Sequence, residues 1–268
     1  PTAAQDLKGK RILLKPNLVE FDANTCINTD PHVVLAAREL FLKFGAAEVW
    51  IGEGPGHRRD TWDLAEKAGY RKIIPDFDDR FIDLNLDEAS PIRAFSNSMD
   101  LYLPHTALAA DLIVSIAKMK THHWAGATLS MKNLFGIVPS AIYGWPKNLL
   151  HYQGIDTSIV ELSRIFRKTF AIVDGITAME GNGPIQGTPI HPKLLVMGKD
   201  LAAVDATCAR LMRLDPLQMS YLRGAAALRL PGLGAIGEAS IEQRGESLRP
   251  LSLPFAVVEQ FTALKLVS

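Results

Sequence analysis

An alternation of apolar strand-like and helix-like segments over the first quarter of the chain constrains the fold most. Residues 11–19, RILLKPNLV, begin as an apolar run and end in a polar break, and residues 47–57, AEVWIGEGPGH, repeat that order. Helix-like segments at 30–46 and 61–74 follow the two runs. This order and spacing are typical of βαβ units, so we expect a parallel sheet.

The segment 30–46, DPHVVLAARELFLKFGA, carries start and stop signals for a helix. Asp30 is placed to cap the first turn, Pro31 takes the first helical position, and Gly45 ends the helix. The apolar side chains recur at helical spacing and fall on one face, which comprises Val33, Val34, Ala37, Leu40 and Phe41.

The rest of the chain continues the alternation. The most apolar strand is expected within 111–120, DLIVSIAKMK. Further strands are expected at 170–176 and 192–200, and further helices around SMKNLFG at 130–136, at 156–168 with Asp156 or Ser158 as cap, at 201–214 and at 219–230. We predict one α/β domain spanning residues 1–268, with a mostly parallel sheet, helices on both faces and small antiparallel additions.

Three segments are less regular. Residues 81–86 and 99–104 resemble strands of a hairpin or of an insertion. Residues 177–189 mix glycine with proline and predict a long loop. Residues 241–246, IEQRGE, predict an edge strand.

Charge and cysteine content exclude several classes of function. Lys+Arg and Asp+Glu are both 29, so the broad basic surface of a nucleic-acid-binding protein is not expected. The two cysteines, Cys26 and Cys208, form no CxxC motif, so the chain cannot build its own iron–sulfur cluster. We expect two free, buried thiols, although spacing alone leaves a disulfide open.

The chain has no apolar run long enough to predict a membrane span. Residue 1 is Pro rather than Met, which indicates that a segment was removed upstream. We expect a cytoplasmic location, with export left open.

Polar residues follow four of the predicted strands. Open parallel sheets bind ligands outside the carboxyl ends of their strands, where such loops converge. We therefore expect one shared crevice. Its candidate ligand-binding residues are Lys15, Asn17, Glu53, Lys118, Lys120, Thr121, His122, Lys132, Asn133, Asp174, Glu180, Gly181 and Gly183.

The residue types in this set favour an anionic ligand. Lysines at several strand ends repel one another unless an anion such as a carboxylate, phosphate or sulfate lies between them. The carboxylates Glu53, Asp174 and Glu180 could balance the lysines, or could hold a divalent cation with His122 or His123.

Each residue alone also has a simpler interpretation. Lys118 and Lys120 could belong to a solvated strand end, and the pair His122–His123 could be hydrogen-bonded loop histidines. Asp205 lies in an apolar helix and could pair with Lys199 instead of acting in a site. The coincidence of four polar loops, rather than any one residue, favours a binding site.

Four long motifs resemble the family catalogued as domain of unknown function 362. They are LLKPNLV, KMKTHHWAGATLSMKNLFGIVP, VDGITAMEGNGPIQG and GKDLAAVDATCARLM, in the family's order, and the resemblance covers about residues 12–240. The resemblance implies that the candidate residues above, together with Asp205, are the family's recurring polar positions. Many members resemble this chain with an added ferredoxin-like module. This sequence lacks the cysteines of that module and resembles the stand-alone form.

We carry two hypotheses of function. The first is an enzyme that acts on a small anionic metabolite, with Lys120, His122 and Glu180 as catalytic groups and a divalent metal held by Asp174 and Glu180. The second is a non-catalytic module that binds a ligand or an iron–sulfur partner protein. A homo-oligomer is left open under either hypothesis. Whether the protein is an enzyme at all is left open by the sequence. The loop 143–146, YGWP, predicts a lid over the crevice or a packed surface loop.

Overall fold

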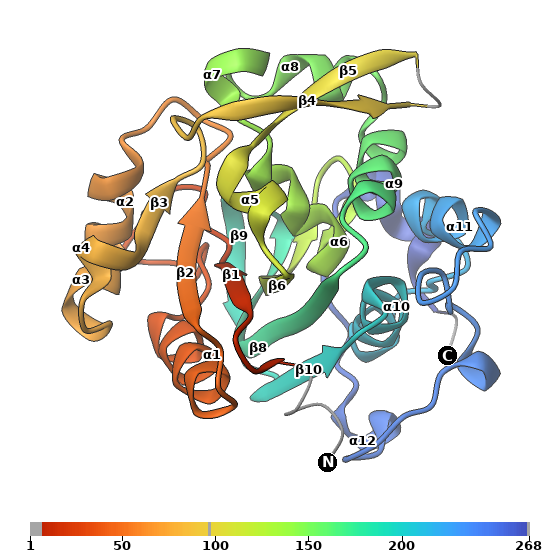
Figure 1. The fold of residues 1–268 in the computed structure, drawn as a ribbon. Coiled ribbons are helices and arrows are strands. Elements are labelled where there is room, and N and C mark those ends of the chain that lie inside the picture. The colour runs from red at the N-terminus through yellow and green to blue at the C-terminus, as the bar shows by residue number, and fades with distance from the viewer. Residues whose placement is uncertain (1–6, 96–97, 267–268) are drawn as a thin grey trace.

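A mixed sheet of eight strands forms the centre of the molecule (Figure 1). The computed structural model describes residues 7–95 and 98–266. The main strand order is β10-β8-β6-β1-β2-β3, with β7 paired to β6 and β9 paired to β8. The strands are β1 (Arg11–Lys15), β2 (Glu48–Glu53), β3 (Phe81–Asp83), β6 (Leu112–His122), β7 (Gly126–Thr128), β8 (Thr169–Asn182), β9 (Gln186–Ile190) and β10 (Leu194–Gly198).

Five strands of this sheet run parallel, and the order of the strands reverses between β1 and β6. The chain goes from β1 outward to β2 and β3, and later from β6 outward to β8. Strands β7, β9 and β10 are antiparallel to their neighbours. The predicted mostly parallel sheet with antiparallel additions is confirmed.

Four helices lie against one face of the sheet: α1 (Pro31–Lys43), α2 (Thr61–Lys67), α3 (Tyr70–Ile73) and α4 (Phe77–Arg80). Alternate side chains of β1, Ile12 and Leu14, pack there against Val34 of α1, as the two-residue period of a strand requires. The Asp30 cap is confirmed, since its carboxylate accepts a hydrogen bond from the backbone of His32. The single helix predicted at 61–74 is divided into α2 and α3 at Gly69, which has a φ of 85°.

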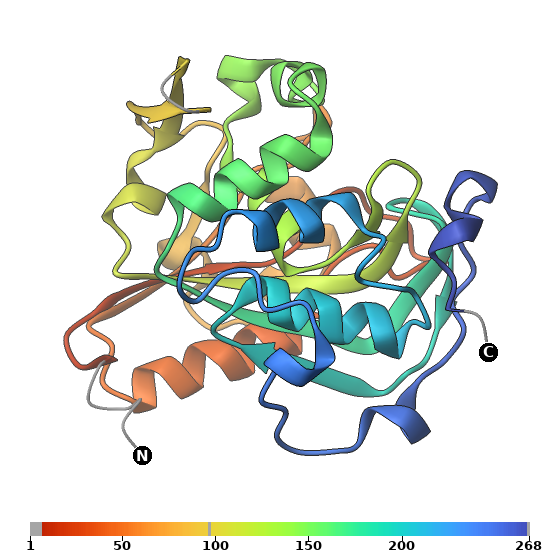
Figure 2. The same cartoon turned by 90° about the vertical axis from the view of Figure 1, so that its right-hand side faces the viewer.

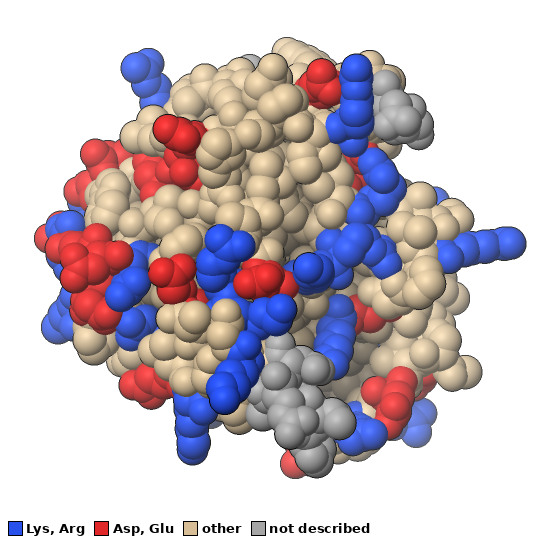
Figure 3. All heavy atoms as spheres, in the orientation of Figure 1, with Lys and Arg blue, Asp and Glu red and all other residues tan. Residues whose placement is uncertain are grey.

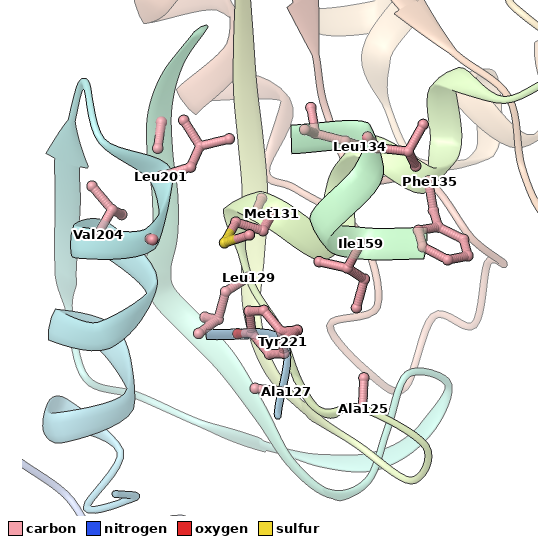
Figure 4. Close-up of a cluster of buried hydrophobic side chains, with 14 of the residues drawn as sticks. Ala125, Ala127, Leu129, Met131, Leu134, Phe135, Ile159, Leu201, Val204 and Tyr221 are labelled. Carbon is pink, nitrogen blue, oxygen red and sulfur yellow. The ribbon is translucent and has the colours of Figure 1, made fainter. Parts of the chain in front are cut away.

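The other face carries the second layer of helices, so α1 and α9 lie on opposite sides of the sheet (Figure 2). Its helices are α5 (His105–Ala109), α6 (Ser130–Asn133), the 3₁₀ helix η2 (Leu134–Ile137), α9 (Ile155–Ile165), α10 (Leu201–Leu211) and α11 (Ser220–Ala227). Figure 4 shows their apolar side chains meeting in one cluster, in which Met131 of α6 lies among Ile159, Leu201 and Tyr221. This packing fixes the short helix α6 beside β6.

The irregular segments differ from their predictions in part. Residues 99–104 form β5 (Met99–Pro104), but the hairpin partner is β4 (Ala89–Ala94), because residues 81–83 join the main sheet as β3. The prediction of a loop at 177–189 is wrong, since β8 continues to Asn182 and β9 pairs back onto it. The strand predicted at 241–246 is also wrong, because this mostly exposed segment pairs with no strand of the described chain.

Short elements complete the chain. They are α7 (Ser140–Tyr143), α8 (Asn148–Tyr152), η3 (Glu238–Ser240), α12 (Leu248–Leu251) and η4 (Glu259–Leu264). Cys26 and Cys208 are both free thiols. Within residues 7–95 and 98–266, no helix has the length and apolarity needed to cross a bilayer. Positive and negative side chains are interspersed over the face drawn in Figure 3, in agreement with a net charge of zero.

Candidate functional site

A cavity of about 170 Å³ lies at the carboxyl ends of the central strands. Residues that follow β1 line it together with residues of β6, so it lies where the order of the strands reverses. This is the position at which open α/β sheets bind ligands. Six of the candidate residues line the cavity: Asn17, Glu53, Lys120, His122, Lys132 and Asn133.

The floor of the cavity is a hydrogen-bonded network around Lys15. The Lys15 ammonium donates to Glu53 Oε1, to Asn133 Oδ1 at 3.1 Å and to Pro16 O at 2.7 Å. An ammonium has three N–H bonds, so all of them are used. Burial lowers the pKa of Lys15, and the carboxylate of Glu53 opposes that shift. Lys15 therefore holds the floor together and has no N–H bond left for a ligand.

Gly136 has a steric reason to be glycine. A Cβ at this position would overlap the Lys15 ammonium and lie 2.5 Å from Glu53 Oε1. The absent side chain lets η2 approach the ion pair closely.

Lys132 is the least satisfied cation of the cavity. Its ammonium lies 4.1 Å from the centre of the Phe135 ring. Among the described residues, no carboxylate lies within 4.0 Å of this ammonium and no atom accepts a hydrogen bond from it. Burial lowers the pKa of Lys132 to about 8, with the positive charge of Lys15 as a second cause. Lys132 therefore offers three N–H bonds to a ligand and changes its charge close to neutral pH.

Lys120 is fully buried and is held by backbone oxygens alone. Its ammonium donates to Ile27 O at 2.8 Å and to Pro184 O at 3.3 Å. Burial lowers the pKa of Lys120 well below its ordinary value, and the charges of Lys118 and Lys132 lower it further. One N–H bond of the ammonium form remains for the cavity.

The hydrogen bonds of His122 define which ring nitrogen carries the proton. Nδ1 accepts from the backbone N–H of Trp124 at 2.9 Å and of Ala125 at 3.1 Å. A backbone N–H can only donate, so Nδ1 is unprotonated. Burial lowers the pKa of His122 well below its ordinary value, with Lys132 as the next cause. The ring is therefore neutral near pH 7, and its Nε2–H is a donor.

The sequence prediction missed Lys147, which lies in the loop between α7 and α8 and lines the cavity. Its ammonium donates to Gly54 O at 2.8 Å, to Phe135 O at 2.8 Å and to Val138 O at 2.6 Å. Burial lowers the pKa of Lys147 to about 7, but all three N–H bonds of its ammonium form already have acceptors. Lys147 therefore fastens this loop to the end of β2 and to η2. The signal in the sequence that could have found it is a lysine directly after the aromatic Gly-Trp-Pro turn.

Aromatic rings form one side of the cavity. His122 stacks on His123 with ring centres 5.0 Å apart, and Trp124 stacks on His151 at 4.9 Å. His57, which lies in the polar loop expected after the second predicted strand, also lines the cavity, and so does His151 of α8, which the prediction missed. Pro146 of the predicted lid loop also lines the cavity, while the motion expected of a lid stays a prediction.

Several candidate residues lie outside the cavity lining. Lys118 and Asp174 pair at 2.6 Å, and the Asp174 carboxylate also accepts from the backbone N–H of Asp30 and Ile176. Thr121 donates to Gly181 O, and Gly183 lies so close to Thr121 that a Cβ would overlap its carbonyl oxygen.

Glu180 also lies outside the cavity lining, and its carboxylate accepts from the backbone N–H of Ala256 at 2.7 Å. It thereby holds the C-terminal segment to the sheet. The catalytic role predicted for Glu180 and the metal predicted at Asp174 and Glu180 stay predictions. Within the described part of the chain, no group of three or more His, Cys, Asp or Glu side chains lies close enough to hold a metal ion.

Asp205 lies outside the cavity lining and holds the helix that carries Lys132. Its carboxylate accepts from the backbone N–H of Ser130 at 2.7 Å and of Met131 at 3.0 Å, and from the Ser130 hydroxyl at 2.5 Å. These bonds cap the first turn of α6, the helix that carries Lys132. Burial raises the pKa of Asp205 to about 7. The alternative ion pair with Lys199 is not formed between these two described residues.

The cavity thus combines donors and acceptors that have no partner within the described chain. The donors are the N–H bonds of Lys132, the remaining N–H bond of Lys120 and His122 Nε2–H. The unpaired acceptors are Asn17 Oδ1 and Glu53 Oε2, and Thr128 Oγ1 is also unpaired. Buried polar atoms normally have partners, so this concentration makes the cavity the candidate binding site within the described chain.

The fold and this set of polar residues define a member of a known family of α/β proteins. The family described as "Domain of unknown function (DUF362)" matches residues 12–210, and the chain belongs to it. The chain is also similar to a curated protein, "Thylakoid-associated protein sll1697" of Synechocystis sp. (strain ATCC 27184 / PCC 6803 / Kazusa). The two are 32% identical over 233 residues, which cover 83% of this chain and 69% of the relative.

Two solved structures show a looser likeness. One is the lactate racemase apoprotein from Thermoanaerobacterium thermosaccharolyticum, with 16% identity and a TM-score of 0.44 over 70% of this chain and 48% of that one. The other is a protein from Thermotoga maritima, with 17% identity and a TM-score of 0.45 over 78% of this chain and 56% of that one. The chain spans about half the length of these two structures. Likenesses at this level do not bear on substrate or activity.

Proposed function

We propose that this protein is an enzyme that binds a small anionic metabolite in the cavity at the carboxyl ends of β1 and β6 and transfers a proton to or from it. The observation that carries the proposal is the unpaired Lys132 ammonium beside the partly paired Lys120. Among the described residues neither lysine has a carboxylate within 4.0 Å, so a site that keeps two such lysines together favours an anion between them.

Lys132 is the group best suited to transfer the proton. Its pKa of about 8 lets it give or accept a proton near neutral pH. Its ammonium makes no hydrogen bond within the described chain that would have to break first.

His122 fits a different role from the proton transfer that its sequence position suggested. Nδ1 is occupied by two backbone N–H donors, so the ring cannot take a proton there without losing both bonds. Loss of the Nε2 proton from a neutral imidazole is also unfavourable. The ring is instead suited to donate a hydrogen bond from Nε2 to a substrate oxygen that gains negative charge, as neutral histidines do in other enzymes.

Binding is tested with a panel of small carboxylates, phosphate and sulfate, measured by thermal shift and titration calorimetry. Wild type is compared with Lys132→Met, and with Lys43→Met as a matched control at an exposed lysine of α1. We expect the Lys132 variant to lose about tenfold or more in affinity and the Lys43 variant to match wild type. Equal responses of all three proteins to every anion would refute an anion site.

Turnover is tested by incubating the bound anions in D₂O and following exchange of carbon-bound protons by NMR. We expect exchange in wild type and none in Lys132→Met. His122→Asn is the sharper variant, because the Asn Oδ1 can replace Nδ1 as acceptor while the donor at Nε2 is removed. We expect it to keep the fold and binding and to slow exchange by about 100-fold, the usual effect of removing one such donor.

Binding without exchange by any member of the panel would favour the second hypothesis, a binding module for a ligand or for an iron–sulfur partner protein. The predicted metal is tested separately, by titrating the protein with divalent cations. Stabilisation that Asp174→Asn abolishes would support it.

A further inference from the structure

The cavity contains unpaired acceptor atoms in addition to the free donors of Lys132, Lys120 and His122. Among the described residues, five buried side-chain nitrogen or oxygen atoms have no hydrogen-bond partner, and three of them belong to residues that line this cavity. Those three are Asn17 Oδ1, Glu53 Oε2 and Thr128 Oγ1. The first two can only accept hydrogen bonds, so they cannot bind an anion.

The network around Lys15 fixes the direction of both acceptors. Asn133 donates through Nδ2 to Lys15 O and to Ser115 Oγ, so its Oδ1 must accept. Asn17 lies 3.2 Å from that Oδ1 and must therefore present its NH₂ group there, which leaves its own Oδ1 free. Lys15 binds Oε1 of Glu53 and leaves Oε2 free.

A neutral donor group on the ligand suits these two acceptors better than a cation does. Glu53 is the only carboxylate among the described residues that line the cavity, and Lys15 already balances its charge. A ligand ammonium or a metal ion at Glu53 Oε2 would be repelled by Lys15 and Lys132. A hydroxyl group donates one hydrogen bond and brings no charge.

The small volume of the cavity indicates that the hydroxyl and the anionic group belong to one small molecule. The volume of about 170 Å³ is close to that of a cavity that binds benzene, so it suits a ligand of about six to ten non-hydrogen atoms. Glu53 and Lys132 are near enough for their charges to influence each other.

We propose that the cavity binds a small hydroxylated anion, whose anionic group contacts Lys132, Lys120 and His122 Nε2–H and whose hydroxyl donates to Glu53 Oε2 or Asn17 Oδ1. This inference rests on the proposed function and adds the class of its substrate. The anionic group is a carboxylate or a phosphate.

The test uses pairs of probes that differ by one hydroxyl group. They are acetate and glycolate, propionate and 3-hydroxypropionate, and propyl phosphate and glycerol 3-phosphate, with affinities measured by titration calorimetry. In wild type we expect the hydroxylated member of at least one pair to bind about tenfold more tightly, the usual effect of a hydrogen bond to a charged acceptor. The pair that shows the preference identifies carboxylate or phosphate as the anionic group.

Two variants locate the effect. Glu53→Gln can keep an oxygen toward Lys15 and present an NH₂ group to the ligand, so we expect the preference for the hydroxyl to disappear. Asn17→Ala removes the other acceptor and covers the case in which Glu53→Gln does not fold. Glu39→Gln, at an exposed position of α1, is the matched control and should leave the preference unchanged.

The outcomes separate this inference from the proposed function. Equal binding within every pair, with loss of both members in Lys132→Met, would overturn the inference and leave the anion site standing. A preference that survives in both Glu53→Gln and Asn17→Ala would also overturn it. Absence of binding by all six probes would overturn the anion site and the hydroxyl site together.

Discussion

Two buried polar clusters lie at the same end of the sheet and differ in how completely they are paired. In the paired cluster, which comprises Lys118 and Asp174 with their backbone partners, both carboxylate oxygens and the ammonium have partners. In the cavity cluster, which comprises Asn17, Glu53, Lys120, His122 and Lys132, donors and acceptors remain free. Both clusters consist of the residue types that the sequence marked as functional. The comparison teaches that pairing, rather than residue type, separates a stabilising cluster from one that still offers free donors and acceptors.

The largest effect is expected from a substitution that breaks the paired cluster. Asp174→Ala leaves the Lys118 ammonium buried beside a single carbonyl, so the free energy of unfolding should fall by about 3–5 kcal/mol. Denaturant unfolding followed by circular dichroism measures it. Asp63→Ala, which breaks the exposed pair with Lys67, is the control and should cost less than about 1 kcal/mol. Similar small losses in the two variants would contradict the role assigned to this cluster.

A smaller effect is expected at the floor of the cavity cluster. Gly136→Ala places a methyl group against the Lys15–Glu53 pair, which should lower the free energy of unfolding by about 1–3 kcal/mol and weaken anion binding. Gly237→Ala is the control, because a Cβ there meets nothing closer than Ser240 Oγ at 3.4 Å. Unchanged stability and binding in Gly136→Ala would show that the floor can move without consequence.

In contrast to Asp174→Ala, Lys132→Met should weaken anion binding without lowering the stability of the fold. The substitution removes a cation that has no partner within the described chain, so the free energy of unfolding should stay within about 0.5 kcal/mol of wild type or rise. Anion affinity should fall at the same time, as measured by titration calorimetry. A marked loss of stability would place Lys132 in the same class as Lys118.

The pH dependence gives the smallest effect. Lys132 is charged below its pKa of about 8 and neutral above it, so anion affinity should be highest below pH 8 and fall by up to about tenfold for each further pH unit. Because this pKa lies below the ordinary value of 10.5, the folded state binds fewer protons than the unfolded state between about pH 8 and 10.5. Lys132 therefore opposes folding at neutral pH, and that cost should lessen as pH rises through this range. Calorimetry at several pH values measures the affinity, and Lys132→Met should remove the part of the dependence that centres near pH 8.

The sequence predicted the sheet and the place of the site because both follow from local patterns. Apolar runs separated by capped helices specify parallel strands, and the carboxyl ends of such strands converge in any open sheet of this kind. Lys120, His122 and Lys132 could therefore be assigned to one crevice before any contact was known. The continuous apolar run at 11–19 likewise predicted a buried strand.

The sequence could not say which candidates face the cavity. Lys118 and Lys120 are two residues apart in one strand, yet one pairs with Asp174 and the other lines the cavity, because β8 places a carboxylate beside only the first. Lys147 was missed because its role depends on three backbone carbonyls that the fold brings together from the end of β2 and from η2 with the residue after it. The loop predicted at 177–189 was wrong because glycines that usually mark turns can also lie in a hairpin whose partner is close in sequence.

The cap that Asp205 provides has a consequence for the integrity of the site. Helix α6 has four residues, too few to be stable alone, and it is anchored by a carboxylate 75 residues further along the chain than Ser130. The direction of the Lys132 side chain is thus set by the late helix α10. A fragment that stops before α10 would keep every cavity residue and still lose their arrangement, so this pocket cannot be transplanted as a short motif.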